Sequence, residues 1–88
     1  MQKNREKVEA IIHPESDERW YAHFYDRSLG RPEQRVLATG TFLDLFHNDQ
    51  YIAGRIEHRL PGGYYFKPDN TTEAELTLED GETVEFYL

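Results

Sequence analysis

Hydrophobic and polar positions alternate with a period of two over most of this chain, a pattern typical of strands that bury one face. The alternation runs through residues 7–12, 20–25, 51–59, 74–78 and 83–88. Aromatic and β-branched residues occupy many of these positions, as strands prefer. We therefore predict an all-β fold with little or no helix.

The first of these segments has a competing interpretation. A helix over Gln2–Ile12 is the alternative, since most of its charged residues are well tolerated in helices. We favour a strand, because Val8, Ala10 and Ile12 alternate with polar neighbours up to His13-Pro14.

Turn-forming residues separate the alternating segments. They lie at Pro14–Glu18, Asp26–Glu33, Asn48-Asp49, Pro61-Gly62-Gly63, Asp69–Thr72 and Asp80-Gly81. Six to eight short strands at this spacing predict a small antiparallel barrel or rolled sheet. An 88-residue chain forms one domain, so we expect a single β domain over residues 1–88, with residues 1–5 disordered.

Three local patterns carry more specific predictions. Asp80-Gly81 stands between two alternating segments, which is typical of a hairpin with a type I′ turn. Thr41–His47 has only one charged residue, which suits a strand buried on both faces. Gly54 interrupts a strand pattern, which indicates a bend or a close backbone approach, such as a barrel corner.

The net charge of −7 comes from the end of the chain. Residues 1–67 contain ten acidic and ten basic side chains, whereas residues 68–88 contain only acidic ones. These seven acids are Asp69, Glu73, Glu75, Glu79, Asp80, Glu82 and Glu85. The balance disfavours a DNA-wrapping protein, which needs clustered Lys and Arg, and predicts one acidic surface on the C-terminal hairpin.

Composition excludes several other classes of protein. The absence of cysteine rules out disulfides, thiolate metal sites and a cysteine nucleophile. No apolar stretch approaches the roughly 20 residues that span a bilayer. Met1–Ala10 lacks the apolar core of a signal peptide, so we expect a cytoplasmic protein without membrane contact.

No motif in the chain predicts catalysis. The four histidines lack metal-binding spacings, Ser16 and Ser28 lack the context of a nucleophile, and no glycine-rich phosphate loop occurs. A small barrel filled by its own side chains also leaves little room for a pocket. We therefore expect no enzymatic activity, no catalytic residue, no metal and no cofactor.

One set of short motifs carries a family resemblance. Arg19-Trp20, Thr39-Gly40, Arg55–His58, Gly63–Tyr65 and Leu78–Gly81 follow one another in this order. The pattern resembles a family of short proteins with a domain of unknown function, carried by phages and conjugative elements of Gram-positive bacteria. The resemblance covers about residues 8–88. It implies an SH3-like all-β fold and an accessory role on a mobile element, and it brings no catalytic residues.

These observations predict a module that binds another macromolecule. Carboxylates on alternate strand residues lie roughly 6.5–7 Å apart, close to the spacing of nucleic-acid phosphates. They would attract a partner protein with a basic surface, and the mobile-element context suggests an anti-CRISPR-like inhibitor of a host defence nuclease. The predicted partner-binding residues are Glu73, Glu75, Glu79, Glu82, Glu85, Tyr51, Tyr65 and Tyr87.

Two other functions stay open. The chain could bind nucleic acid through arginines and exposed tyrosines, with the acidic hairpin turned away. The residues for this alternative are Arg19, Arg35, Arg55, Arg59, Tyr21 and Tyr25. The third candidate is a structural homodimer that pairs its edge strands. The sequence does not distinguish a monomer from a dimer, nor a functional acidic surface from a merely solvated one.

Overall fold

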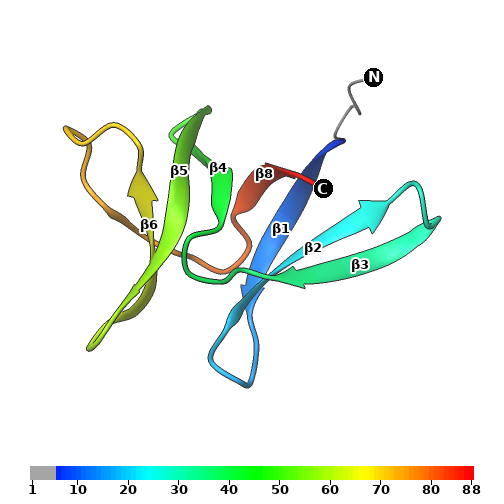
Figure 1. Ribbon diagram of the computed structural model, residues 1–88, viewed down its shortest axis with the longest axis horizontal. Coiled ribbons are helices and arrows are strands. Elements are labelled where there is room, and N and C mark those ends of the chain that lie inside the picture. Colours follow the sequence, from blue (N-terminus) through cyan, green and yellow to red (C-terminus); the bar gives the residue numbers. More distant parts are fainter. Residues whose placement is uncertain (1–5) are drawn as a thin grey trace.

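The computed structural model describes residues 6–88, and within this range all regular structure is strand (Figure 1). The strands are β1 (Lys7–Pro14), β2 (Trp20–Asp26), β3 (Arg31–Val36), β4 (Phe42–His47), β5 (Gln50–Arg59), β6 (Gly63–Pro68), β7 (Leu76–Thr77) and β8 (Thr83–Tyr87). The all-β prediction is therefore confirmed, and Lys7–Pro14 is a strand rather than a helix. The expected disorder of residues 1–5 lies outside the described residues.

All eight strands pair antiparallel in one sheet, in the order β3-β2-β1-β8-β4-β5-β6-β7. The sheet consists of two meanders, β1 to β3 and β4 to β7, each connected by local turns. The last strand, β8, lies between β1 and β4 and joins the two meanders (Figure 1).

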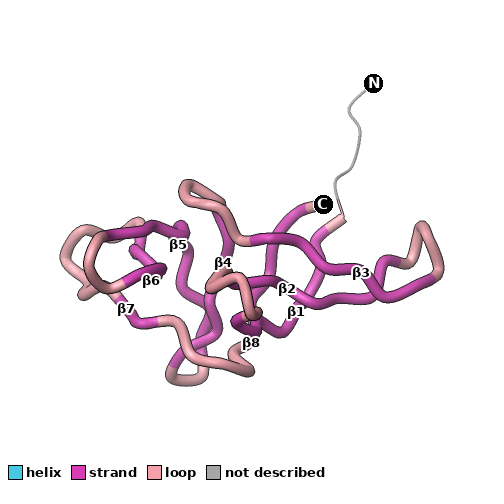
Figure 2. Tube along the Cα trace, turned by 90° about the horizontal axis from the view of Figure 1, so that it is seen from below, coloured by secondary structure: helices cyan, strands magenta, loops and turns pink. Residues whose placement is uncertain are grey.

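One face of the sheet carries the hydrophobic core. Its buried residues alternate along the strands, as in Val8, Ala10 and Ile12 of β1. The core continues through both meanders and the segments between them, with Ala22, Leu37, Leu43, Leu45, Ile56, Phe66, Leu78, Val84 and Phe86 in the same cluster. Strands that are distant in the sheet order share this cluster, so the sheet curves around it (Figure 2). The opposite face is called the outer face below.

The sheet is open, so the barrel, one of the two predicted forms, is wrong. Among the described strands, β3 pairs only with β2, and β7 pairs only with β6. β7 is two residues long and β3 contains Pro32, which has no N–H to donate. Short strands and proline are typical of free sheet edges.

The predicted C-terminal hairpin is also wrong, because β7 and β8 lie in different parts of the sheet. A type I′ turn needs positive φ at both central residues, whereas here only Gly81 has it (φ 91°), which fits a type II turn. Gly81 N donates to the carbonyl of Ile12, and Ile12 N donates to the carbonyl of Glu82. These bonds direct the chain after the turn onto β1 instead of back along β7.

The prediction that residues 41–47 are buried on both faces is wrong as well. Leu43 and Leu45 lie in the core, but Phe42 and Phe46 are exposed on the outer face. β4 therefore alternates like its neighbours. The predicted loop at residues 26–33 is shorter than expected, because β3 begins at Arg31.

Two predicted turn and strand features are confirmed. Asn48 and Asp49 both have positive φ and join β4 to β5 in a two-residue hairpin, with His47 opposite Gln50. Gly54 is a site of close approach rather than a barrel corner, because the Phe66 ring and the Lys67 carbonyl lie against it.

Candidate functional site: an acidic and aromatic patch on the outer face

Three carboxylates lie side by side across three central strands. Glu9 of β1 is directly opposite Glu85 of β8, and Glu85 is directly opposite Asp44 of β4. All three side chains point to the outer face, because they alternate with core residues. Like charges directly opposite one another destabilise a sheet.

The chain partly compensates these charges with one lysine. Lys7 Nζ lies 3.1 Å from Asp44 Oδ2 and 3.8 Å from Glu85 Oε1, and it lies 5.5 Å from the centre of the Tyr87 ring. The hydrogen bond to Asp44 raises the pKa of Lys7. The hydroxyl of Tyr51 donates to Glu9 Oε2 over 3.3 Å. Three carboxylates against one ammonium leave the group negative.

Four aromatic side chains surround the carboxylates on the same face. Phe42 is 69% exposed, Tyr87 52%, Phe46 40% and Tyr51 39%. The rings of Phe46 and Tyr51 pack together with centroids 5.0 Å apart. We call this set the outer-face patch; it consists of Lys7, Glu9, Phe42, Asp44, Phe46, Tyr51, Glu85 and Tyr87.

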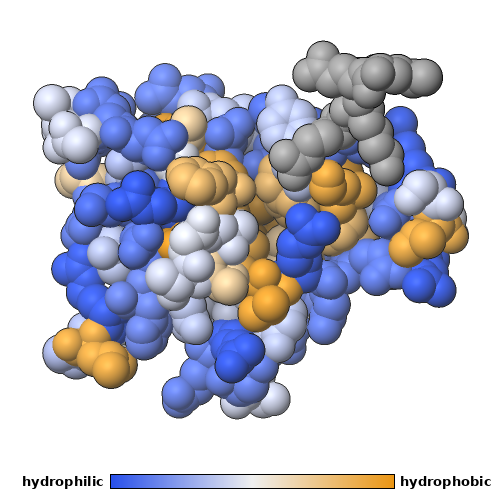
Figure 3. Space-filling view, viewed as in Figure 1, coloured by the Kyte–Doolittle hydropathy of each residue, from blue (hydrophilic) through white to orange (hydrophobic). Residues whose placement is uncertain are grey.

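The outer-face patch contains a shallow hollow of about 150 Å³. Lys7, Phe42, Asp44, Glu85 and Tyr87 are among the residues that line it. In the space-filling view, apolar side chains also gather over the middle strands and at the tips of the β2–β3 and β5–β6 turns (Figure 3). Aromatic residues around a hollow can anchor a partner, and clustered exposed aromatics often mark interaction sites.

The structure brings only some of the predicted partner-binding residues together. Glu85, Tyr51 and Tyr87 belong to the outer-face patch, with Glu85 in β8 and the tyrosines in β5 and β8. The remaining five are Glu73, Glu75, Glu79, Glu82 and Tyr65, which lie in or beside β6, β7 and the turn before β8. The predicted single acidic surface on a hairpin is therefore wrong.

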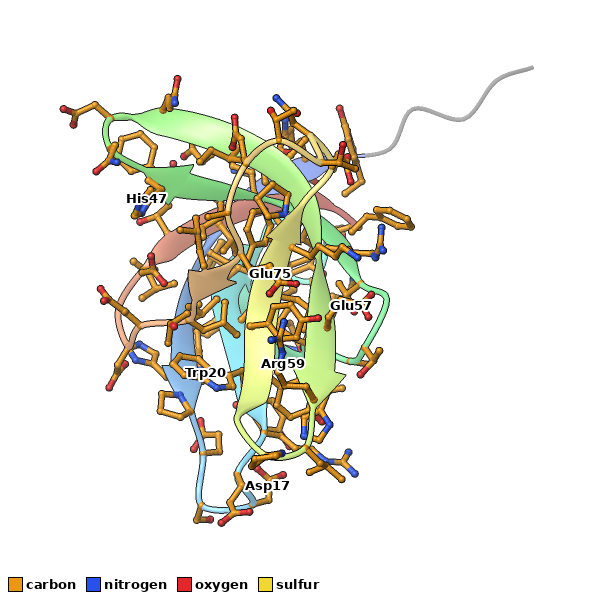
Figure 4. All side chains as sticks on the ribbon, turned by 90° about the vertical axis from the view of Figure 1, so that its left-hand side faces the viewer. Asp17, Trp20, His47, Glu57, Arg59 and Glu75 are labelled. Atoms are coloured by element: carbon orange, nitrogen blue, oxygen red, sulfur yellow. The ribbon has the colours of Figure 1, made fainter. Side chains whose placement is uncertain are left out.

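Glu75 and Tyr65 take part in a separate cluster with Arg59. Arg59 forms an ion pair with Glu75, and its guanidinium lies 3.9 Å from the centre of the Tyr65 ring. The two charged side chains point toward one another beside β6 (Figure 4). The hydrogen bond to Glu75 raises the pKa of Arg59. Glu75 is thus neutralised within the chain.

Glu82 and Glu79 form the turn before β8. Glu82 Oε1 accepts a hydrogen bond from the backbone N of Glu79 over 2.7 Å. Burial raises the pKa of Glu82. This carboxylate therefore stabilises the turn locally, and Glu73 lies apart from it in the β6–β7 loop.

The sequence predicted three of the eight residues of the outer-face patch and missed the other five, two of which are the carboxylates of Glu9 and Asp44. Glu9 and Asp44 belong to the charge-balanced part of the chain, so the charge count did not single them out. Only the pairing of β8 with β1 and β4 places them beside Glu85. Alternation did indicate that Glu9 points away from the core, but it does not say which strands are neighbours.

The residues proposed for nucleic-acid binding do not share one surface. Arg55 pairs with Glu57 at 2.7 Å on the outer face, and Arg59 pairs with Glu75. Arg35 lies over the ring of the core residue Phe86, with 5.1 Å from guanidinium to ring centre. Arg19 lies just before β2, on the loop that follows β1.

The two tyrosines of that alternative are also separate. The hydroxyl of Tyr21 donates to Asp17 Oδ2 over 2.7 Å, which lowers the pKa of Asp17. Tyr25 is exposed near the other end of β2, opposite Pro32. Tyr21 and Tyr25 are thus four positions apart on one strand.

Two of the four histidines lie beside carboxylates. His13 bonds to Asp80, His23 Nε2 lies 3.3 Å from Glu15 Oε1, and the two rings meet edge to face. Within residues 6–88, no group of three or more His, Asp or Glu side chains could hold a metal ion. Nor does this part of the chain contain a helix that could cross a bilayer.

A larger cleft lies at one end of the sheet, contrary to the expectation that core side chains leave little room for a pocket. Its volume is about 680 Å³, and it lies between the β1–β2 loop and the β5–β6 turn. Because the sheet is open, its two ends do not close over this space.

Compared with known proteins, the chain matches no protein-family model, no curated protein and no solved structure. The resemblance to the mobile-element family therefore stays a prediction from short motifs.

Proposed function

We propose that this protein is a non-enzymatic binding module whose outer-face patch engages a protein partner with a basic surface. The observation that carries the proposal is the row of Glu9, Glu85 and Asp44 across three central strands, surrounded by exposed aromatic rings. A row of carboxylates on one face attracts basic side chains, so a partner with a basic surface would be complementary to it.

The position of Lys7 supports this choice of partner. Its ammonium already lies between two carboxylates and near the Tyr87 ring, which is the arrangement that a partner's lysine or arginine would adopt. One ammonium does not neutralise three carboxylates. The exposed rings of Phe42 and Phe46 offer apolar area to the same partner.

The wider biological role rests on the family resemblance alone. An SH3-like fold, a cytoplasmic location, an accessory role on a mobile element and inhibition of a host defence nuclease all stay predictions. A basic, nucleic-acid-handling enzyme would match the negative charge of the outer-face patch. No described feature favours the nucleic-acid alternative, because its arginines are dispersed or paired.

The test uses a triple variant that removes the three charges while keeping the side-chain shapes: Glu9→Gln, Asp44→Asn and Glu85→Gln. The probe is an alternating lysine–alanine decapeptide, titrated at low and high salt. Wild type should bind it in a salt-sensitive manner, and the variant should bind it about ten-fold more weakly. Circular dichroism checks that the variant is folded.

The matched control removes the same number of charges elsewhere, through Glu18→Gln, Glu73→Gln and Glu79→Gln. It should leave peptide affinity within about two-fold, since these acids lie outside the outer-face patch. Equal weakening in both variants would show that only net charge matters. Binding of a single-stranded oligonucleotide in place of the peptide would favour the alternative function.

A further inference from the structure

Lys7 belongs to β1, yet its ammonium lies over the neighbouring strand β8 and reaches the strand beyond it. Its Cα is opposite Tyr87 of β8, whereas its Nζ contacts Asp44 of β4. Adjacent strands are roughly 4.8 Å apart, so the lysine stem crosses β8 beside Tyr87 and Glu85 to make this contact. Lys7 therefore lies across the outer-face patch.

The ammonium of Lys7 occupies two of the three carboxylates that a basic partner would use. Asp44 and Glu85 both lie within ion-pair distance of it, and the hollow of about 150 Å³ opens beside them. Glu9 differs, because among the described residues its carboxylate has no basic partner and accepts a bond only from the Tyr51 hydroxyl. A cation that approaches the patch thus finds Glu9 open and the other two carboxylates taken.

Lys7 can leave its position without any change in the sheet. Its side chain is 38% exposed, and those of Asp44 and Glu85 are 29% and 26% exposed, so water reaches the ion pairs. Exposed ion pairs of this kind contribute little to stability. The backbone at the start of β1 stays fixed, because Leu88 N donates to the Glu6 carbonyl and β1 pairs with β8 from Lys7 onward. A change of side-chain rotamer is therefore enough to release both carboxylates.

We infer that Lys7 is an internal competitor, which occupies the outer-face patch until a basic partner displaces it. This inference rests on the proposed function and adds how access to the patch is regulated. Because Lys7 is tethered beside Asp44 and Glu85, a single basic side chain from outside competes poorly for them. A partner with several cations also binds Glu9, and this additional contact favours the exchange. The contact thus selects partners with clustered basic side chains.

Lys7→Gln removes the competing ammonium and keeps an unbranched polar side chain. The probe is the same alternating lysine–alanine decapeptide that tests the proposed function. The variant should bind this peptide about two- to five-fold more tightly than wild type, because Asp44 and Glu85 no longer have an internal partner. If Lys7 only offset the charges of the sheet, its loss would leave the affinity unchanged or lower it.

The matched control is Arg31→Gln, because any loss of a positive charge makes the protein more attractive to a basic peptide. Arg31 forms an ion pair with Glu33 on the edge strand β3, outside the outer-face patch. Its replacement should leave the peptide affinity as in wild type. The difference between the two variants therefore measures what Lys7 does at the patch itself.

The lysine side chain also reports its own displacement. The chain has only three lysines, Lys3, Lys7 and Lys67, so a ¹H–¹³C spectrum of lysine-labelled protein contains few ε-methylene signals. The Lys7 ammonium lies 5.5 Å from the centre of the Tyr87 ring, and the ring current shifts the adjacent methylene. Added peptide should move this signal in a saturable manner toward the position of a lysine in water.

The outcomes separate this inference from the proposed function. If wild type binds the peptide and Lys7→Gln binds it no more tightly than Arg31→Gln does, the inference fails and the proposed function stands. An unmoved Lys7 signal in the peptide-bound protein has the same meaning. If neither wild type nor Lys7→Gln binds the peptide, the proposed function fails and the inference fails with it. Binding by Lys7→Gln alone would support both.

Discussion

At the residue scale, Gly54 shows how the absence of a side chain at one position lets β5 and β6 pack closely. A Cβ at this position would lie 2.9 Å from Phe66 Cε1 and would also overlap the Lys67 carbonyl oxygen. Phe66 is fully buried, so its ring has no room to move away. We expect Gly54→Ala to destabilise the protein by about 1–3 kcal/mol, measured by urea denaturation.

Ala53 is the natural control, because it is the neighbour of Gly54 on the opposite, solvent-facing side of β5. Ala53→Val should change the free energy of unfolding by less than about 0.5 kcal/mol. A Gly54→Ala protein as stable as wild type would mean that β5 and β6 separate easily at this point.

Alternation predicted which face of the sheet a residue lies on better than it predicted whether that residue is buried. Ile52, Gly54 and Ile56 share the inner face of β5, as the period of two requires. Phe42 and Phe46 did not follow the expected double burial, because hydrophobicity alone does not show whether a second layer covers a strand. Two of the four exposed rings in the candidate site, Phe42 and Phe46, were therefore expected in the core.

At the scale of the element, β8 has a role that no local pattern indicates. The Asp80-Gly81 pair between two alternating segments favours a local hairpin, yet β8 pairs with β1, which is distant in the chain. The pairing of β8 depends on the geometry of the turn and on the edges of β1 and β4, which β8 joins. Sequence patterns identified the strand correctly but could not identify its neighbours.

This central position predicts how the backbone amides exchange with solvent. β8 has a partner on both sides, whereas β7 is short and has a partner on one side only. In hydrogen exchange monitored by NMR, the amides of Thr83–Tyr87 should be among the slowest and those of Leu76–Thr77 among the fastest. Comparable rates in β7 and β8 would contradict the strand order.

At the scale of the whole molecule, the net charge of −7 has a different meaning from the one that composition suggested. Of the C-terminal acids, Glu75 forms an ion pair with Arg59, Glu82 stabilises a turn, and Glu85 belongs to the outer-face patch. The patch takes two of its three carboxylates from the charge-balanced part of the chain. The open sheet, in turn, leaves the cleft that a closed barrel would have filled.

The strand order also predicts that the molecule unfolds as one unit. Val84 of β8 is buried opposite Ala10 of the first meander and Leu45 of the second, so its methyl groups connect the two. Val84→Ala should lower the free energy of unfolding by about 2 kcal/mol. In urea denaturation, Trp20 fluorescence and the β5–β6 amide signals should show the same lowered unfolding midpoint, because both meanders depend on β8.

Val36→Ala is the control for this prediction, since Val36 is half-buried on the edge strand β3 and lies opposite only Tyr21. This substitution should lower the free energy of unfolding by about 1 kcal/mol or less. If Val84→Ala instead lowers the midpoint of the β5–β6 signals and leaves that of Trp20 unchanged, the two meanders unfold independently. In that case β8 would lie between the two meanders without coupling their unfolding. The fold would then not hold the outer-face patch rigid, because the patch spans both meanders.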